Sequence, residues 1–236
     1  MEVDAKFLLE LLKKHYPHAK IVLHYGNNFE LLTAVILSAQ CTDMTVNKVT
    51  SKLFPKFRNL KFKMQNAKLR AKIKKITPKI QELINFAQVP IEELAMDIKS
   101  TGFYNNKAKN LQAAAKVILE KFHGEVPKTM EELLIIPGVA RKTANIVLGN
   151  AYGIVEGIAV DTHVKKQAQR FGLSTNTNPD KIEQDLMKRF DKKDWLPLTY
   201  MLIEHGRAVR FKKNSLCTVC NGPCELEALA IHEAKK

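Results

Sequence analysis

Residues 128–153 read "KTMEELLIIPGVARKTANIVLGNAYG", and this stretch determines how the middle of the chain folds. Thr129 is followed three residues later by Glu132, which is the capping-box pattern found at the start of a helix. Pro137 and Gly138 end that helix, because glycine tolerates the positive φ that a tight turn requires. The stretch therefore predicts a helix, a tight turn and a second helix.

The second helix is expected over about residues 140–148, with Gly149 as its stop. A helix start exposes backbone N–H groups and carries partial positive charge, so this turn can hold a phosphate. Lys142 lies in the first turn beside Arg141. Because these positive neighbours disfavour the ammonium form, we expect more of the neutral amine, which can attack a sugar carbon and form a Schiff base.

Helical spacing of apolar residues continues along the rest of the chain. Residues 4–16, "DAKFLLELLKKHY", start with Asp4 as a cap, and residues 27–40, "NNFELLTAVILSAQ", start with two asparagines, one of which can cap. No alternating run is long enough for a convincing strand, and "GIVEGIAV" at 153–160 comes nearest. We therefore expect an all-α fold built from many short helices.

Composition points to the kind of partner. The 236 residues suit one large domain or two lobes, and the formal net charge of +14 favours a polyanionic partner, nucleic acid first. No apolar run reaches the roughly 18 residues that a membrane span needs. The N-terminus lacks the pattern of a secretory signal, so we expect a cytoplasmic protein without membrane contact.

One basic segment, residues 44–81, contains no Asp or Glu. It holds twelve cations: Lys48, Lys52, Lys56, Arg58, Lys61, Lys63, Lys68, Arg70, Lys72, Lys74, Lys75 and Lys79. An apolar stripe at helical spacing runs through Leu69, Ile73, Ile76, Ile80, Leu83 and Ala87. Pro78 is expected to open a new helix. The cations form either a solvated face of a packed helix pair or an added phosphate-binding surface.

Asp161 precedes another helical run, "AVDTHVKKQAQRFGL" at 159–173, and is expected to cap it. A second role is compatible with capping. The carboxylate can stabilise positive charge that develops on a deoxyribose ring, or move a proton during departure of a base.

Five motifs in this order and spacing closely resemble the endonuclease III family of bifunctional DNA glycosylases with abasic-site lyase activity. They are "LSAQCTD" at 37–43, "GFYNNKAKN" at 102–110, "IPGVARKTA" at 136–144, "AVDTH" at 159–163 and "EHGR" at 204–207. The resemblance covers most of residues 20–224. It implies two helical lobes with a DNA cleft between them, one of which is a six-helix barrel carrying the helix-hairpin-helix. The expected boundaries are 22–154 for the barrel, with the hairpin at 129–150 and a basic insertion at about 56–88, and 1–21 with 155–236 for the second lobe, which ends in a cysteine loop at 210–224.

The resemblance also implies an activity. It predicts removal of oxidised pyrimidines of the thymine glycol type from double-stranded DNA, through a Schiff base on Lys142 and β-elimination, with Asp161 as the catalytic carboxylate. Relatives that act on adenine or mismatched thymine do not carry this lysine, so Lys142 favours the lyase-competent branch. A monofunctional glycosylase and a non-catalytic DNA-binding module of the same fold are the alternatives. We expect a monomer, located with the nucleoid, that binds damaged or abasic DNA.

Further residues are matched to DNA contacts by the same resemblance. Gln40 matches the residue that fills the space left by the flipped nucleotide, Phe103 the wedge in the opposite strand, and His163 a site-lining position. Ala140 departs from the family, in which many members have a second glycine. The other expected contacts are Asn105, Pro137, Gly138, Val139, Ala140, Arg141, Arg207 and Arg210.

The cysteines depart most from the family pattern, C-x6-C-x2-C-x5-C, which holds a [4Fe–4S] cluster. Arg210 stands at the first ligand position, and Cys224 follows Cys220 after three residues instead of five. The loop retains Cys217, Cys220 and Cys224, while Cys41 is expected as a reduced cysteine in the barrel. Three outcomes stay open: no cluster, an unusual three-cysteine cluster, or a Cys3His zinc site with His232. The proposed catalytic residues need no cofactor.

Overall fold

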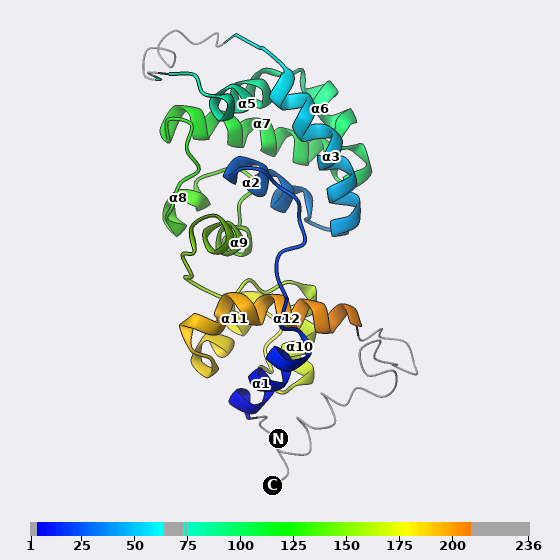
Figure 1. The fold of residues 1–236 in the computed structure, drawn as a ribbon, viewed down its shortest axis with the longest axis vertical. Coiled ribbons are helices and arrows are strands. Elements are labelled where there is room, and N and C mark those ends of the chain that lie inside the picture. Colours follow the sequence, from blue (N-terminus) through cyan, green and yellow to red (C-terminus); the bar gives the residue numbers. More distant parts are fainter. Residues whose placement is uncertain (1–3, 64–72, 74, 209–236) are drawn as a thin grey trace. The chain divides into compact units, whose positions relative to one another are not determined.

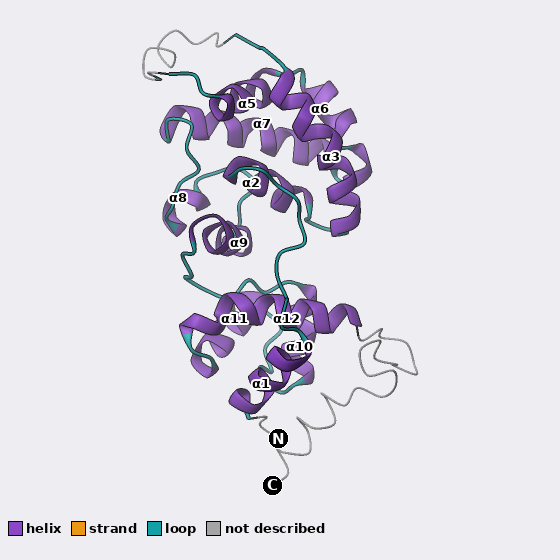
Figure 2. Ribbon diagram, in the orientation of Figure 1, coloured by secondary structure: helices purple, strands orange, loops and turns teal. Residues whose placement is uncertain are grey.

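The computed structural model describes residues 4–63, 73 and 75–208, and every regular element in these ranges is a helix (Figures 1 and 2). The all-α prediction is confirmed. The helices are α1 (Ala5–His15), α2 (Asn28–Leu37), α3 (Asp43–Asn59), α5 (Pro78–Gln88), α6 (Ile91–Asp97), α7 (Tyr104–Lys121), α8 (Met130–Leu134), α9 (Arg141–Tyr152), α10 (Thr162–Arg170), α11 (Pro179–Arg189) and α12 (Trp195–Ala208), with the short 3-10 helices η1 (Lys99–Thr101) and η2 (Lys192–Asp194). None of the described helices is both long and apolar enough to cross a membrane.

The chain divides into two compact units, Val22–Ile154 and the pair of segments Met1–Ile21 and Val155–Lys236. In the first unit α5 packs along α7, α3 packs on α5, and α2 packs on α9. Three phenylalanine rings form the centre of the α2, α3 and α5 contact. Phe57 stacks on Phe86 at a centroid distance of 4.0 Å, and Phe29 meets Phe86 edge-on at 5.1 Å. Such aromatic pairs stabilise a core beyond their buried area.

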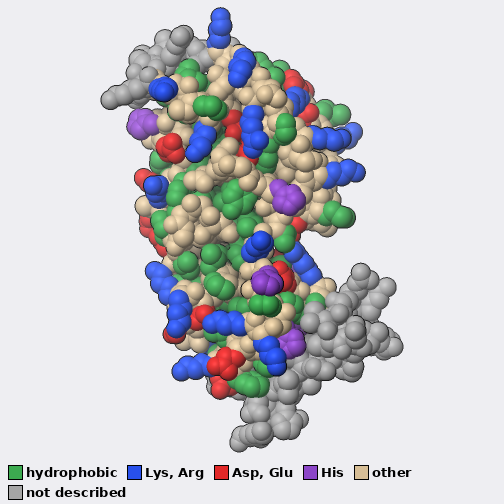
Figure 3. Space-filling view, viewed as in Figure 1, with side chains coloured by type: hydrophobic (Ala, Val, Ile, Leu, Met, Phe, Trp, Pro, Cys, Tyr) green, Lys and Arg blue, Asp and Glu red, His purple; other side chains and the backbone are tan. Residues whose placement is uncertain are grey.

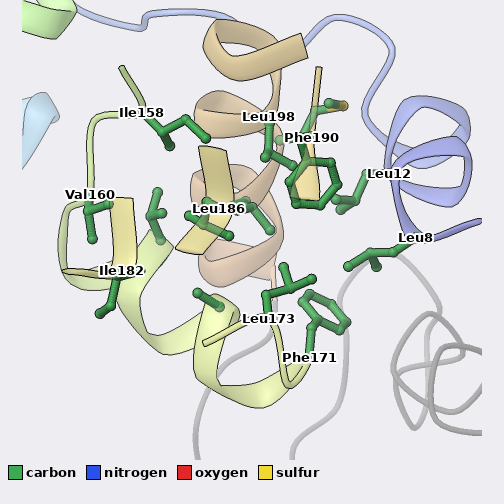
Figure 4. Packing of buried hydrophobic residues seen from close by; sticks show 14 of the residues in the cluster. Leu8, Leu12, Ile158, Val160, Phe171, Leu173, Ile182, Leu186, Phe190 and Leu198 are labelled. Atoms are coloured by element: carbon green, nitrogen blue, oxygen red, sulfur yellow. The ribbon is translucent and has the colours of Figure 1, made fainter. Parts of the chain in front are cut away.

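The second unit has its own apolar core (Figure 4), which joins α1, α10, α11 and α12. Leu8 and Leu12 of α1 are fully buried, as are Leu186 of α11 and Leu198 of α12. The glycine-punctuated stretch at 153–160 forms no strand. Its last four residues are buried, and Ile158 and Val160 belong to this core.

Side-chain caps mark most helix starts. Asp4 caps α1 by accepting hydrogen bonds from Lys6 and Phe7, and Asn27 caps α2 by accepting one from Glu30, so both predicted helix starts are confirmed. The starts of α3, α5, α8, α10 and α11 are capped as well, by Thr42, Thr77, Thr129, Asp161 and Asn178. By contrast, α6, α7 and α9 begin without a side-chain cap.

The predicted end of the second hairpin helix was wrong. Gly149 is buried inside α9, and the helix continues to Tyr152. It ends at Gly153, which adopts the left-handed conformation with φ of 66° and donates its N–H to the Gly149 carbonyl. A glycine ends a helix where the chain leaves the helix axis in the left-handed conformation, as at Gly153. Gly149 is buried in the packed part of α9, so the helix continues through it.

The apolar stripe predicted in the basic segment is only partly correct. Pro78 is the first residue of α5, as predicted, and Ile80, Leu83 and Ala87 of this helix are buried. Ile76 is 44% exposed because it lies in the chain that leads into Pro78 rather than on the helix. Leu69, Lys68, Arg70, Lys72 and Lys74 lie outside the described residues.

Two cations of the basic segment are paired with acids of the same unit. Lys56 Nζ lies 2.8 Å from Glu93 and 2.6 Å from Asp97, and Arg58 pairs with the buried Glu30. The pKa of Lys56 is raised, because these two hydrogen-bonded acids outweigh burial, which acts in the opposite direction. On the face shown in Figure 3, Lys and Arg side chains are spread over both units.

Candidate active site

The hairpin predicted from the sequence is formed by α8, α9 and the turn between them. Thr129 Oγ1 accepts the Glu132 N–H at 3.3 Å and donates to the Glu132 carboxylate at 3.1 Å. In the turn, the Val139 N–H donates to the Ile136 carbonyl at 3.1 Å, and Gly138 has φ of +81°. The tight turn is therefore confirmed, with glycine at the position that requires it.

Gly138 is also required by a close approach from α7. A Cβ atom added to Gly138 would lie 3.0 Å from Cβ of Asn110 and 3.1 Å from its Nδ2. Sequence reasoning missed Asn110 as a support of the turn. Its place at the end of "GFYNNKAKN" was the available signal, but a contact across 28 residues of chain cannot be read from one sequence.

The start of α9 leaves backbone donors without a cap. Ala140 occupies the capping position, and its methyl group accepts no hydrogen bond. Lys142 lies in the first turn, is half-buried, and makes no hydrogen bond or ion pair to the described residues. The N–H groups of a first helical turn carry partial positive charge, so this end of α9 attracts anions.

Gln40 and Phe103 share an uncommon backbone conformation. Both are left-handed, with φ of 52° and 48°, and both are exposed, Phe103 to 66%. Non-glycine residues adopt this region at a cost, so the surrounding structure must hold them there. Phe103 stands directly before α7, and Asn105 is exposed in the first turn of that helix. Exposure excludes a core role for Phe103.

A buried lysine connects the segments that carry these two residues. Lys107 of α7 is 5% exposed, and its Nζ donates to the carbonyls of Leu37 and Thr101, each at 2.8 Å. Burial lowers the pKa of Lys107, and the Cys41 thiol nearby opposes this change. Sequence reasoning missed Lys107, although helical spacing places it on the same face as Leu111 and Ala114, which are buried.

Asp161 caps α10 as predicted. Its Oδ1 accepts the N–H groups of His163 and Val164, each at 2.8 Å, while Oδ2 makes no hydrogen bond within the described ranges. His163 is half-buried and lies against Gly206 of α12, where an added Cβ would come within 2.9 Å of its Nδ1. Gly206 therefore permits the close packing of α10 on α12. Arg207 is exposed beside it.

The predicted residues fall into both units. Lys142, the hairpin, Gln40 and Phe103 belong to Val22–Ile154, and Asp161, His163 and Arg207 belong to the other unit. Arg210, Cys217, Cys220, Cys224 and His232 lie outside the described residues. Within the described part of the chain, no three His, Cys, Asp or Glu side chains form a group that could hold a metal. The sequence of the loop supplies three cysteines, one fewer than the four that the family pattern uses for a [4Fe–4S] cluster. The fourth cysteine of the chain, Cys41, belongs to the other unit.

Residues 33–192 match the family model of the HhH-GPD superfamily of base excision DNA repair proteins. The all-helical fold and the α8–α9 hairpin agree with this class. The chain is 47% identical to endonuclease III of Synechocystis sp. over 94% of its own length and 89% of the relative. Two solved structures, a non-covalent endonuclease III–DNA complex and a trapped endonuclease III–DNA covalent intermediate, match at 35% identity with TM-scores of 0.78 and 0.79, each covering 98% of this chain and 97% of the other. The chain belongs to the endonuclease III family. Its predicted enzyme class, DNA glycosylase and abasic-site lyase, is confirmed.

Proposed function

We propose that the chain removes oxidised pyrimidines of the thymine glycol type from double-stranded DNA and then cleaves the strand by β-elimination. The observation that carries this proposal is the Lys142 amine, half-buried at the uncapped start of α9 and unpaired within the described residues. A solved structure of a relative trapped as a covalent intermediate with DNA supports a covalent route for this chain.

In the proposed reaction, Lys142 Nζ attacks C1′ of the damaged nucleotide, and the glycosidic bond breaks as the base leaves with the bonding electrons. The sugar ring opens when the nitrogen forms a double bond to C1′. Loss of a 2′ proton then expels the 3′-phosphate, which cleaves the strand. Asp161 stabilises positive charge on the sugar and moves protons, and its free Oδ2 leaves one oxygen for this task while Oδ1 caps α10.

DNA contacts are proposed for the two left-handed residues and the hairpin. Gln40 fills the space vacated by the flipped nucleotide, and Phe103 wedges the opposite strand, for which its exposed ring is suited. The hairpin turn and the start of α9 bind a phosphate through backbone N–H groups. The Val139 N–H already donates to the Ile136 carbonyl within the turn, so the N–H groups that bind the phosphate come from neighbouring residues. Asn105, Arg141, His163 and Arg207 complete the proposed contacts, and a monomer bound to duplex DNA in the cytoplasm is the proposed working form.

The test is product analysis on a duplex that contains one thymine glycol. The parent chain should release the base and cleave the strand, while Lys142→Gln should lose strand cleavage and retain most DNA binding. Lys116→Gln, at an exposed position of α7, is the control and should behave as the parent. Base release without cleavage by the parent would instead indicate a monofunctional glycosylase. Binding without either product would indicate a DNA-binding module.

A further inference from the structure

The Lys107 amine closes the ends of two helices at once. Leu37 is the last residue of α2, and Thr101 is the last residue of η1. Carbonyls at helix ends lack partners within the helix and carry partial negative charge, so an N–H donor from a lysine is favourable there. Both acceptors lie 2.8 Å from the same Nζ, which fixes the two helix ends relative to each other.

Each of these helix ends lies within three residues of a left-handed residue. Gln40 follows Leu37 by three residues, and Phe103 follows Thr101 by two. Non-glycine residues in this uncommon conformation depend on the surrounding structure to keep them there, and Lys107 binds both of the segments that carry them. Phe103 and Lys107 are also joined through α7 itself, because the Lys107 N–H donates to the Phe103 carbonyl at 3.0 Å.

The chemistry of the anchor is unusual for a core position. Burying an amine is unfavourable, and an apolar side chain of the same length would fill the space without that penalty. An apolar residue would, however, leave the Leu37 and Thr101 carbonyls without this donor. A lysine at this position therefore indicates that the two hydrogen bonds to the Leu37 and Thr101 carbonyls matter more than filling the space.

We propose that Lys107 is a positioning residue that sets the spacing between Gln40 and Phe103, so that both can enter the duplex when the damaged nucleotide leaves it. The inference rests on the proposed function, in which Gln40 and Phe103 contact the opened duplex. Lys107 does not touch the substrate. It acts through the two segments that it ties together.

The experiment compares Lys107→Met with Lys116→Met, a lysine at an exposed position of the same helix. Single-turnover excision is measured for thymine glycol opposite adenine, and for thymine glycol opposite an abasic analogue, where no base pair has to open. Lys107→Met should be slower by about tenfold on the paired lesion, the size of effect expected for lost hydrogen bonds, and nearly unchanged on the unpaired lesion. Equal slowing on both duplexes would overturn the inference, because general loss of structure affects both.

Double variants separate this inference from the proposed function. Gln40→Ala and Phe103→Ala should each slow excision of the paired lesion in the parent, and each should have a smaller effect when added to Lys107→Met. No effect of these single variants in the parent would refute the proposed function of the two residues. Full effects in both backgrounds would refute Lys107 positioning alone. If Lys107→Met fails to fold, Lys107→Gln replaces it, because the shorter glutamine side chain does not reach both carbonyls. Slower excision of the paired lesion alone is then expected, and equal slowing on both duplexes overturns the inference.

Discussion

Helices α9 and α10 begin in opposite ways, although each carries a proposed catalytic residue at its start. At α10 the Asp161 carboxylate accepts two backbone N–H groups, which orient that carboxylate. At α9 the capping position is Ala140, which accepts none, and Lys142 follows in the first turn. In the proposed function, the missing cap at α9 keeps its backbone donors available to a phosphate, while the cap at α10 orients the Asp161 carboxylate for catalysis.

The largest expected effect is a loss of base release when Asp161, at the capped start of α10, is replaced. Asp161→Asn keeps a cap oxygen but removes the charge, so base release should fall by about a hundredfold or more while folding is largely preserved. Asp161→Ala should lose the same activity and in addition about 1 kcal/mol of stability, because the cap is gone. Excision kinetics and urea unfolding measure the two effects. Near-parental excision by Asp161→Asn would show that the carboxylate only caps.

Next comes the turn that leads into the uncapped helix. Gly138→Ala adds a methyl group at φ of +81° and against Asn110, so it should cost about 2 kcal/mol of stability and weaken DNA binding. Gly153→Ala is the matched control, because φ is +66° and nothing lies within 4 Å of the added Cβ. It should cost about 1 kcal/mol and leave DNA affinity unchanged. Equal losses of affinity in the two variants would mean that the turn has no special role in binding.

Adding a side-chain cap to α9 should make the chain more stable and weaken its binding to DNA. Ala140→Asp places a carboxylate where the backbone, with φ of −99° and ψ of 169°, already suits a capping residue. We expect stability to rise by about 0.5–1 kcal/mol and affinity for undamaged duplex to fall by about tenfold, because the new carboxylate occupies the donors and repels phosphate. Thermal melts and fluorescence anisotropy provide the measurements. Unchanged affinity would contradict a phosphate site at this helix start.

The smallest effect concerns the capped start of α2, which should influence folding and not DNA. Asn27 caps α2 and also donates to Glu82 at 2.8 Å. Burial, with repulsion from Glu30, raises the pKa of Glu82 to about 7 from 4.5. The folded chain therefore holds a proton that the unfolded chain releases between these values, so stability should fall as pH rises from 4.5 to about 7.

Glu82→Gln should flatten this part of the profile, by about 1.4 kcal/mol for each unit of the pKa shift that it removes, because the amide does not titrate. Urea unfolding at several pH values checks this. If stability of Glu82→Gln still fell with pH as in the parent, another group would cause the pH dependence. If Glu82→Gln changed DNA affinity, the start of α2 would not differ from the start of α9 in its effect on DNA binding.

Local chemistry made much of the fold predictable. Asp4, Thr129 and Asp161 cap helices and Pro78 begins one, because each of these preferences depends on residues within one turn. The errors at Gly149 and Ile76 arose where packing and the path of the chain decide the outcome. Likewise, Lys107 and Asn110 support the site through contacts between distant segments, which periodicity cannot reveal. The roles of Lys142 and Asp161 stay predictions.

Reduction of the reaction mixture with borohydride, followed by peptide mapping, tests the Schiff base most directly. Incubation with a thymine glycol duplex should give one covalent DNA adduct, on the peptide that contains Lys142, and Lys142→Gln should give none while still binding the duplex. An adduct on another lysine or on the N-terminal amine, or strand cleavage by the parent without any adduct, would contradict Lys142 as the nucleophile.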